Sequence, residues 1–534
     1  MRHLLLTLGH NSSAILVEDG EIKCGYEEER LTGVKSDSRF PIRAIEQVMG
    51  KAKPDAIYCT HWEPSADVMK LNLKYWDPSY AEGIPVRSHT DNTHHDTHAH
   101  AAWCFATRAF PIQNAYILIA DGFGSFGEHL SLYQISPYGD PHLVFRAHGY
   151  DTSLGLMYQY ATAFLGMKMH EDEYKLLGYE VHIDPNHADK LHQPILDYIH
   201  EWYNKISNFK LGSVYDPMFN LEALAAVREH FFKQFSQVLD LVKLTDPTTF
   251  EARTVLAYFV QSVLEGCIIR VLSNFTVENL VVSGGCFYNV KLNKILLEDI
   301  PGKFCAYPLA GDQGNAIGLY AMDHPSFRFP KNLFWGQRKL ESAGVVEGLH
   351  YVSRTGLASS IRHFLNQYGF VNLVRGHMEF GPRALCNTST LAMPTLEVVE
   401  TINKANNRNT VMPMAPVMTR PMYKACFKHA DRVWKSEQYM ILALEYHEKI
   451  ADLYPGAAHR YKFPFYSHST GRPQVIGEIL NDPVVDVLLT KGPLINTSFN
   501  YHGKPIAFDM PSVIENHQLQ RVNNPNFNTL VVTD

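Results

Sequence analysis

The sequence predicts an α/β protein built from two domains. Two short apolar runs, AYILIA at residues 115–120 and LVVS at residues 280–283, have the pattern of buried strands, and each leads into a glycine-rich turn. Between them, residues from about 190 to 272 are poor in glycine and helical in period, which indicates a helical insertion. The length of 534 residues favours two or three domains.

The order of elements begins with a hairpin. LLLTL at residues 4–8 and AILV at residues 14–17 predict two strands joined by a polar Gly-His-Asn-Ser-Ser turn. Residues 330–355 are irregular and contain proline and glycine, so the domain junction is expected there. No internal repeat and no low-complexity tract is visible in the sequence. Beyond the junction, helical runs alternate with sheet-like runs at residues 370–374, 484–489 and 530–532.

Composition and charge exclude several classes of protein. A net charge of −7 argues against a broad basic face, so no polymeric nucleic acid is expected as a partner. No apolar stretch approaches the roughly 18 residues of a membrane span, and the N-terminus lacks the pattern of a leader. A soluble, cytoplasmic protein without a membrane partner is therefore expected. The eight cysteines show no CxxC spacing, which favours reduced thiols.

A dense group of histidines lies just before the apolar run AAWCF. Five histidines fall within residues 89–100. His94 and His98 are four residues apart, so on a helix they would share one face and could bind one metal ion. Asp96 and His100 offer a second pair with the same spacing. Histidines that are merely solvated at a polar helix start are the alternative.

Two carboxylates and two glycine turns extend this candidate cleft. Asp121 and Asp312 each adjoin a glycine turn, so either could be a further metal ligand or a turn former that bonds its own backbone. Ser283-Gly284-Gly285 and Gly122-Phe123-Gly124 follow predicted strands, where backbone N–H groups can converge on a phosphate. Neither turn is a Walker A or GxGxxG motif, so purely structural glycines are the alternative.

The C-terminal half contributes a candidate anion contact. Arg383 follows a Gly-Pro turn, and the stiff backbone there suits a bidentate contact with an oxyanion. A surface salt bridge is the alternative. The run INTSFN at residues 495–500 places several polar ends on a predicted strand or its exit, which is unfavourable unless those ends are hydrogen-bonded.

Eleven motifs, taken in chain order, resemble the carbamoyltransferase family that includes nodulation protein U and tobramycin carbamoyltransferase. The resemblance covers nearly the whole chain, and the order of the motifs is far more specific than any single one. The motifs are GHNSSAILVEDGEI, YEEERLTGVKSDSRFP, HHDTHA, ADGFG, SLGLMYQYATAFLG, EDEYKLLGYE, VSGGCFYNVKLN, GDQGNAIG, HMEFGPRAL, MPMAPV and INTSFNYHGKPI.

The resemblance implies a fold and a reaction. The fold would be an actin/sugar-kinase-like ATPase-fold domain over residues 1–345, with the insertion at about 190–272, followed by a YrdC-like α/β domain over residues 346–534. The C-terminal domain would make carbamoyl-adenylate from carbamoyl phosphate and ATP, releasing pyrophosphate. The N-terminal domain would transfer the carbamoyl group to a hydroxyl, with a bound Fe²⁺ or another divalent metal, Mg²⁺ included, helping to hold the nucleotide.

The resemblance also bears on partners. The acceptor would be a small molecule with a hydroxyl group, with a 5-hydroxymethyl pyrimidine nucleotide, an antibiotic or a sugar as candidates. A homodimer is compatible with the family. Two other functions fit the ATPase fold: a small-molecule kinase, and a nucleotide-regulated binding protein without enzymatic activity.

Residue by residue, the resemblance implies three groups of functional side chains. The metal ligands would be His94, His98, Asp121 and Asp312, with Asp96 and His100 as the alternative to the histidine pair. The catalytic residues would be His10 as the base for the acceptor hydroxyl, Lys35 at the carbamoyl or phosphate oxygens, and Arg383. The nucleotide and carbamoyl phosphate contacts would be Gly122, Gly124, Glu173, Lys175, Gly284, Gly285, Asn289, Arg408, His468, Arg472, Asn496, Ser498 and Asn500.

The C-terminal motifs depart from the family pattern. Three arginines of the family are absent, since His377 and His502 stand in two of their places and residues 411–416 read VMPMAP. Cys386 and Thr388 replace the usual glycine and arginine. We therefore expect a donor pocket with less positive charge, either weakened or rebuilt.

Overall fold

The predicted hairpin belongs to a five-stranded sheet at the N-terminus. The computed structural model describes residues 1–61, 83–88, 93–107, 110–207, 221–342, 344–460, 469–477 and 482–533. The sheet order is β3-β2-β1-β4-β5, with β1, β2 and β3 antiparallel and with β4 and β5 running parallel to β1. Its strands are β1 (Arg2–Thr7), β2 (Ser13–Glu18), β3 (Glu21–Glu27), β4 (Ala56–Thr60) and β5 (Val86–Arg87).

Both faces of this sheet are buried, which explains the uninterrupted apolar run in β1. Leu4 and Leu6 pack with helix α2 (Ile42–Met49), whereas Leu5 points into the main core of the N-terminal half. Alternate side chains of a strand lie on opposite faces, so a strand between two cores carries leucine at every position rather than at every second one.

A second five-stranded sheet repeats the arrangement of the first. Its order is β10-β9-β6-β7-β8, with β6, β7 and β8 antiparallel and with β9 and β10 parallel to β6. Its strands are β6 (Ala115–Ala120), β7 (Glu128–Ile135), β8 (Pro141–His148), β9 (Asn279–Ser283) and β10 (Phe304–Ala306). The N-terminal half is thus a duplicated unit, and the predicted actin/sugar-kinase-like ATPase class of mixed α/β fold is confirmed.

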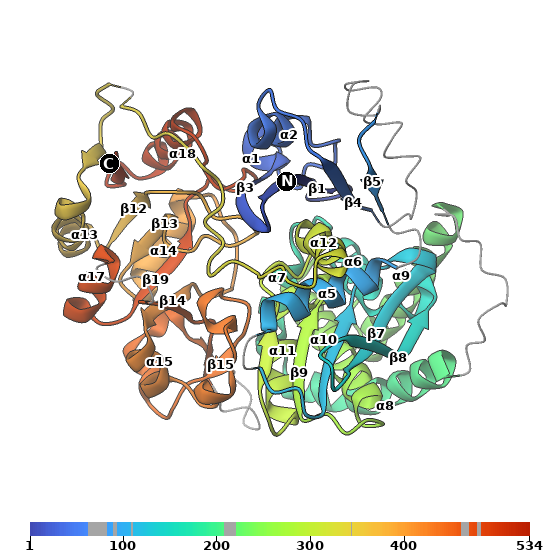
Figure 1. Ribbon diagram of the computed structural model, residues 1–534. Coiled ribbons are helices and arrows are strands. Elements are labelled where there is room, and N and C mark those ends of the chain that lie inside the picture. The colour runs from blue at the N-terminus through green and yellow to red at the C-terminus, as the bar shows by residue number, and fades with distance from the viewer. Residues whose placement is uncertain are drawn as a thin grey trace.

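Two helices cross where the repeats meet. Helix α5 (His94–Ala106) and helix α12 (Asn315–Asp323) lie against each other in Figure 1. At the crossing, a Cβ atom on Gly318 would lie 1.9 Å from the carbonyl oxygen of Thr97, so only glycine permits this approach. The crossing fixes the start of α5 beside the loop that precedes α12.

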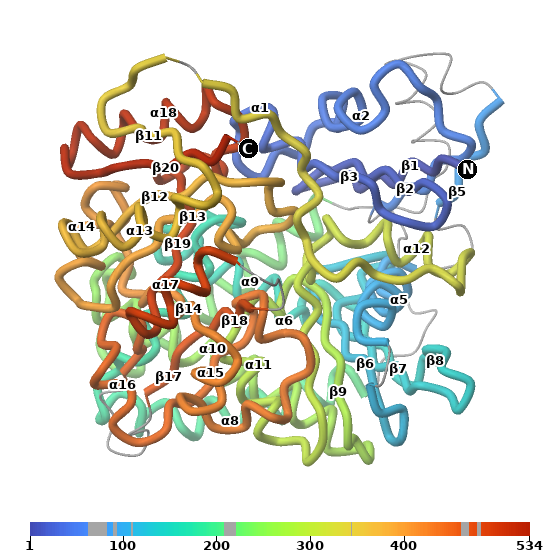
Figure 2. The backbone as a smooth tube through the Cα atoms, turned by 60° about the vertical axis from the view of Figure 1, so that its left-hand side comes forward, coloured from blue at the N-terminus to red at the C-terminus, as the bar shows by residue number. Residues whose placement is uncertain are grey.

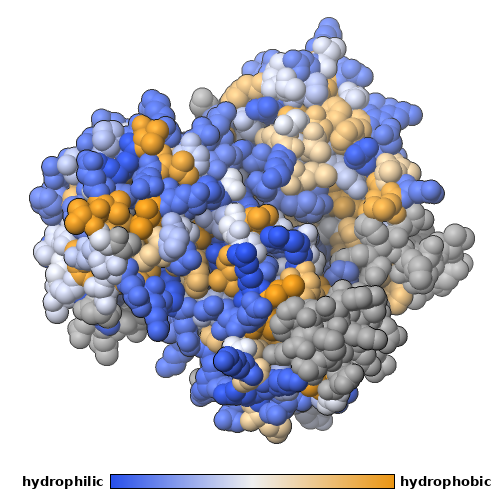
Figure 3. All heavy atoms as spheres, turned by 90° about the horizontal axis from the view of Figure 1, so that it is seen from above, coloured by the Kyte–Doolittle hydropathy of each residue, from blue (hydrophilic) through white to orange (hydrophobic). Residues whose placement is uncertain are grey.

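The predicted helical insertion lies between β8 and β9. It contains α8 (Pro185–Ser207), α9 (Leu221–Leu241) and α10 (Phe250–Leu272). Among the described residues, α10 is the one helix long and apolar enough to cross a bilayer, and 67% of its most apolar window is buried inside the protein, as in a core helix. On the face seen in Figure 3, hydrophobic residues form small groups between hydrophilic ones.

The C-terminal half is built on a mixed sheet of seven strands. Figures 1 and 2 show this half, in orange and red, beside the duplicated unit. The sheet order is β11-β20-β12-β13-β19-β14-β18. The strands are β11 (Leu349–Val352), β12 (Phe370–Val374), β13 (Thr388–Ala392), β14 (Ala415–Thr419), β18 (Gln474–Ile476), β19 (Leu494–Ser498) and β20 (Thr529–Val532). The YrdC-like character of residues 346–534 and the boundary at residue 345 stay predictions.

One strand prediction in this half is wrong. Residues 484–489 lie in helix α17 (Pro483–Lys491), not in a sheet. The side chain of Asp482 accepts the N–H of Val484, and Pro483 occupies the first helical turn, which together start a helix. Val484, Val487 and Leu488 are buried while Leu489 is exposed, so the apolar run VVDVLL has the period of a helix.

Candidate active site

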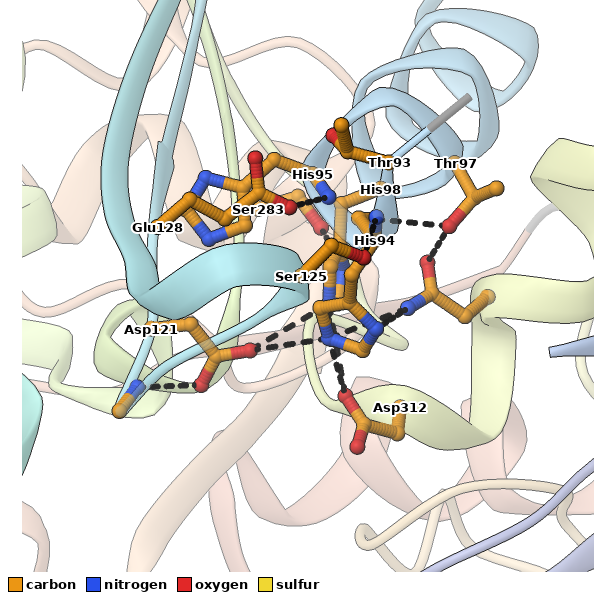
Figure 4. A network of polar contacts seen from close by, with 12 residues as sticks. Thr93, His94, His95, Thr97, His98, Asp121, Ser125, Glu128, Ser283 and Asp312 are labelled. Carbon is orange, nitrogen blue, oxygen red and sulfur yellow. Dashed lines mark hydrogen bonds and ion pairs between the residues drawn. The ribbon is translucent and has the colours of Figure 1, made fainter. Parts of the chain in front are cut away.

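Four side chains from three segments converge near the C-terminal end of strand β6. His94 and His98 lie one turn apart on α5, Asp121 follows β6, and Asp312 starts the short turn before α12 (Figure 4). Nε2 of His94 lies 3.2 Å from Nε2 of His98. Carboxylate oxygens of Asp121 and Asp312 lie 3.2–3.5 Å from these two nitrogens.

The cluster fits a divalent metal ion. One ligand atom from each of the four residues lies within 4.8 Å of the others. Five of the six distances between these atoms are 3.2–3.5 Å, and a regular tetrahedron with edges of about 3.3 Å has its centre about 2.0 Å from each corner, the usual distance from zinc or a similar ion to nitrogen and oxygen. Two imidazoles with two carboxylates are also a donor set that suits such ions.

The outer ring nitrogens of both histidines are engaged by polar neighbours. Nδ1 of His98 contacts Oγ of Ser283 at 3.3 Å, and Nδ1 of His94 contacts the amide of Asn315 at 3.3 Å. A metal-binding histidine donates its outer ring N–H to an oxygen, so the hydroxyl of Ser283 can accept from His98 and hold Nε2 toward the ion, whereas Asn315 presents its amide nitrogen, a donor, to His94. The sequence pattern indicated Ser283 only as part of a candidate phosphate turn and gave no role to Asn315.

Opposite charges in the cluster shift the pKa values of its members. Burial disfavours the imidazolium of His94, but the charge of Asp312 and hydrogen bonds to both carboxylates raise the pKa of His94 to about 10. Burial would raise the pKa of Asp121, yet hydrogen bonds from both histidines hold it below its ordinary value. The cluster therefore requires a positive charge, which either a proton or a metal ion can supply.

This requirement predicts a pH dependence for the metal-free protein. Because the pKa of His94 is raised to about 10, its proton stabilises the fold fully below the unfolded pKa of about 6.5, and this stabilisation is lost as the pH rises through about 10. We expect the melting temperature in chelator to fall between these pH values, and a divalent metal to reduce the fall. A His94→Gln variant should lose this dependence, and an unchanged profile in that variant would contradict the assignment.

A second layer of buried polar residues holds the start of α5. The backbone N–H of His94 donates to Oγ of Ser125 (3.0 Å), and the N–H of His95 donates to Oε1 of Glu128 (2.8 Å). Arg146 pairs with the other oxygen of Glu128 at 3.0 Å. These contacts satisfy backbone donors that have no partner within the helix, and they set the position of the histidine pair.

The alternative ligand pair is used differently. Asp96 forms a capping box with Thr93, and its Oδ1 accepts from Tyr133 (2.6 Å) and Arg146 (2.7 Å). His100 is not a member of the four-residue cluster. The geometry thus brings His94 and His98, not Asp96 and His100, to Asp121 and Asp312.

A cavity of about 500 Å³ adjoins the cluster and is lined by both halves of the chain. Most of the candidate residues line this cavity. It therefore contains groups predicted for the activation step and groups predicted for the transfer step. The candidates that line it are His10, Lys35, Asp121, Gly122, Glu173, Gly285, Asn289, Asp312, Arg383, Arg408, Arg472, Asn496, Ser498 and Asn500.

The other candidates lie elsewhere. His94 and His98 are buried behind the cavity wall, and Lys175 pairs with Asp172 at 2.8 Å outside it. Gly124 lies against His94 and Glu128, each 3.0 Å from an added Cβ, whereas a Cβ on Gly284 would lie 2.2 Å from the carbonyl oxygen of Ala120. Close packing therefore explains why glycine occupies these two positions, without any need for phosphate binding. His468 lies outside the described residues.

Three arginines of the C-terminal half give the cavity its positive charge. Among the described residues, none of Arg383, Arg408 and Arg472 has a carboxylate within ion-pair distance. Arg408 bonds instead to neutral groups, at 2.7 Å to Thr497 and 2.8 Å to Asn500. Burial, with the charge of Arg383, lowers the pKa of Arg472 to about 9. Cations placed together without counter-charges are expected to bind an anion.

Arg383 reaches across to the N-terminal half. Its guanidinium lies 6.0 Å from the ring centre of Tyr288, and its Nε is buried without a hydrogen-bond partner. The hydroxyl of Tyr288 accepts from Gln313, the neighbour of Asp312, at 2.6 Å. Burial lowers the pKa of Arg383 as well. The salt-bridge alternative for Arg383 therefore has no partner among the described residues.

The remaining candidates surround this anion region. Nε2 of His10 lies 3.8 Å from Oδ2 of Asp312, and its ring lies 5.4 Å from that of His170. Lys35 lies 3.9 Å from Glu171. Asn289 caps helix α11 (Val290–Asp299) and bonds to Gln261 at 2.7 Å. On β19, the side chain of Asn496 donates to Ala384 and Gln474, while its Oδ1 is buried without a partner.

Comparison with known proteins agrees with this geometry. A family model described as "Carbamoyltransferase N-terminus" matches residues 68–321, and one described as "Carbamoyltransferase C-terminus" matches residues 363–533. The protein is therefore a transferase of the α/β class whose two halves share one cavity. More particularly, the chain belongs to the carbamoyltransferase family.

Relatives of similar length are distant in sequence. An uncharacterized protein of Methanocaldococcus jannaschii is 26% identical, covering 93% of each chain. Nodulation protein NolNO of Sinorhizobium fredii is 25% identical over 94% of this chain and 75% of its own. Among solved structures, the activator of the 2-hydroxyisocaproyl-CoA dehydratase from Clostridium difficile with bound ADPNP gives a TM-score of 0.34 at 12% identity, covering 61% of this chain and 96% of its own.

Proposed function

We propose that this protein is an O-carbamoyltransferase that uses ATP and carbamoyl phosphate, through carbamoyl-adenylate, to carbamoylate a hydroxyl of a small acceptor. One observation carries the proposal. The same cavity is lined by the two aspartates of the metal cluster, by a half-exposed histidine next to them, and by three arginines without carboxylate partners among the described residues. A phosphorylated donor supplies the missing negative charge.

The activation step has a definite chemical balance. Hydrolysis of carbamoyl phosphate gives carbamate and phosphate, after which a carbamate oxygen attacks the α-phosphorus of ATP and pyrophosphate leaves. Arg383, Arg408 and Arg472 would bind the oxyanions of donor and nucleotide, which stabilises the charge that develops on phosphorus. The resemblance implies arginine at all three positions, and they are present although three other arginines of the family motifs are absent.

The transfer step would take place beside His10. The acceptor oxygen forms a bond to the carbamoyl carbon, the bond from that carbon to the phosphate oxygen breaks, and AMP leaves with the electron pair. Nε2 of His10, which lies 3.8 Å from Oδ2 of Asp312, would accept the hydroxyl proton.

The histidine and aspartate cluster would hold Fe²⁺ or another divalent ion. His94, His98, Asp121 and Asp312 fit such an ion by donor type and by spacing. When bound, the ion supplies positive charge near the phosphate of the nucleotide. The residues of this chain then orient the substrates and move the proton.

A product assay tests the proposal. The protein is mixed with ATP, Fe²⁺ and carbamoyl phosphate under anaerobic conditions, and pyrophosphate and phosphate are measured. We expect equal amounts of both, together with a mass gain of one carbamoyl group on an acceptor drawn from hydroxymethyl nucleotides and aminoglycosides. Release of ADP with a phosphorylated acceptor would instead indicate the kinase. Absence of pyrophosphate and of any modified acceptor would contradict the proposal.

A further inference from the structure

A buried ion pair of the N-terminal half is hydrogen-bonded to both backbone polar groups of one residue, Gly381, in the C-terminal half. Glu27 ends β3 and Arg30 lies in the short helix α1 (Glu28–Thr32), and each side chain is only 4% exposed. Nη2 of Arg30 lies 3.1 Å from Oε2 of Glu27 and donates to the carbonyl oxygen of Gly381 at 2.8 Å. The N–H of Gly381 donates in turn to Oε2 of Glu27 at 3.1 Å.

Gly381, the residue that the ion pair contacts, lies two residues before Arg383. Gly381 has φ +103°, a conformation that favours glycine, and an added Cβ would lie 2.6 Å from Leu309, three residues before Asp312. Pro382 follows, with the fixed φ of proline. The backbone from Gly381 to Arg383 thus has little conformational freedom. A shift of Gly381 would therefore also move Arg383.

The other end of the same loop is fixed from within the C-terminal half. Oε1 of Glu379 accepts the N–H groups of Leu385, Asn387 and Thr388 at 2.7, 2.8 and 3.0 Å. The loop that carries Arg383 is therefore held twice, once by its own domain and once by the Glu27 and Arg30 pair. The second hold relates the loop to the half that contains the histidine and aspartate cluster, and so does the N–H of Phe380, which donates to the carbonyl oxygen of Leu333 at 2.7 Å.

We propose that the buried Glu27–Arg30 pair is a positioning device by which the N-terminal half fixes Arg383 of the C-terminal half inside the shared cavity. The inference rests on the proposed binding of a phosphorylated donor at Arg383. Arg383 has no carboxylate partner among the described residues and lies over Tyr288 of the other half, so its place relative to the cluster depends on contacts between the halves. Glu27 and Arg30 also line the cavity, so the experiment has to distinguish an action through Arg383 from a direct contact with the bound anion.

A double-mutant cycle on the full chain tests this dependence. Pyrophosphate is the probe, and its dissociation constant is measured calorimetrically for the wild type, for R30M, for R383M and for the double variant. We expect R30M and R383M each to weaken binding about tenfold, and the double variant to bind no more weakly than R383M alone, because coupled residues are not additive. Arg30→Lys should recover part of the loss.

The controls separate positioning from folding. R30M leaves Glu27 buried without its partner and also removes the arginine that lies 2.8 Å from Oε1 of Glu29. The variant E27Q/R30M, which removes the charge of Glu27, is therefore measured as well, and the melting temperature of each variant is recorded. The matched control is E437Q, which alters a buried glutamate paired with Arg420 at 2.9 Å in the C-terminal half, and it should bind pyrophosphate like the wild type.

Three outcomes would overturn the inference. They are wild-type binding that does not depend on Arg383, unchanged binding in both R30M and E27Q/R30M, and an effect of the double variant equal to the product of the single effects. Because binding is measured without turnover, a protein that binds pyrophosphate through Arg383 but releases none from ATP would refute the proposed function alone.

Discussion

Replacing Asp312 by asparagine is expected to weaken the binding of a divalent metal by about 100-fold or more. Asp312 supplies an oxygen that lies 3.2 Å from His94 and 3.4 Å from His98, and its charge offsets that of an ion in the cluster. An amide keeps the shape but loses the charge, so the histidines alone would hold the ion weakly. Calorimetric titration with Co²⁺ or Zn²⁺, with metal analysis of the purified protein, measures the change.

Asp323 offers a matched control for this variant. It lies at the end of α12, its side chain is 45% exposed, and it pairs with Arg87 at 3.7 Å, away from the histidine and aspartate cluster. Asp323→Asn should therefore bind metal like the wild type. Equal affinity in Asp312→Asn and the wild type would show that the cluster is a buried ion-pair network and not a metal site.

Replacing Arg383 by methionine is expected to lower the rate of pyrophosphate release by about 100- to 1,000-fold, the loss typical when one oxyanion donor is removed. The same variant should be as stable as the wild type or up to about 2 kcal/mol more stable, because an apolar side chain of similar volume replaces a buried cation that lacks a partner. Kinetics of pyrophosphate release and denaturant unfolding measure the two effects.

The combination of lower activity and retained stability is diagnostic. An arginine in a structural salt bridge would behave in the opposite way, since its removal strands a buried carboxylate. Arg420→Met is the comparison, because Arg420 pairs with the buried Glu437, and it should destabilise the fold with little effect on pyrophosphate release. Loss of stability in Arg383→Met would contradict the role of Arg383 as an anion contact.

Local patterns predicted much of the fold. Strands β1, β2, β6, β9, β12 and β20 lie where apolar runs and turn residues indicated them, because each run is short and bounded by glycine or polar residues. The run VVDVLL was misread, since a short apolar segment does not distinguish a buried strand from a helix until its cap is recognised. The duplication of the N-terminal half could not be detected in the sequence, because the two sheets have corresponding strand orders but different amino-acid sequences.

The candidate site was predictable where spacing or motif carried the signal. The spacing of four residues between His94 and His98, and the glycine turns beside Asp121 and Asp312, were visible in the sequence. These four residues were therefore predicted as metal ligands, and the structure brings them together. Glu128 and Arg146 carried no such signal, because a glutamate in a strand and an arginine in the next strand meet the start of α5 only after folding. The contact of Arg30 with Gly381 could not be predicted for the same reason, since the two residues are 351 positions apart in the sequence.

The tight crossing of α5 and α12 at Gly318 gives the cluster a further property. It sets His94 beside Asp312 although more than 200 residues separate them in the chain. An ion bound by both would act as a cross-link that closes a very long loop, and binding to the folded state alone would raise the stability of the whole duplicated unit. The supply of metal during folding would then govern how much folded protein forms as well as how active it is.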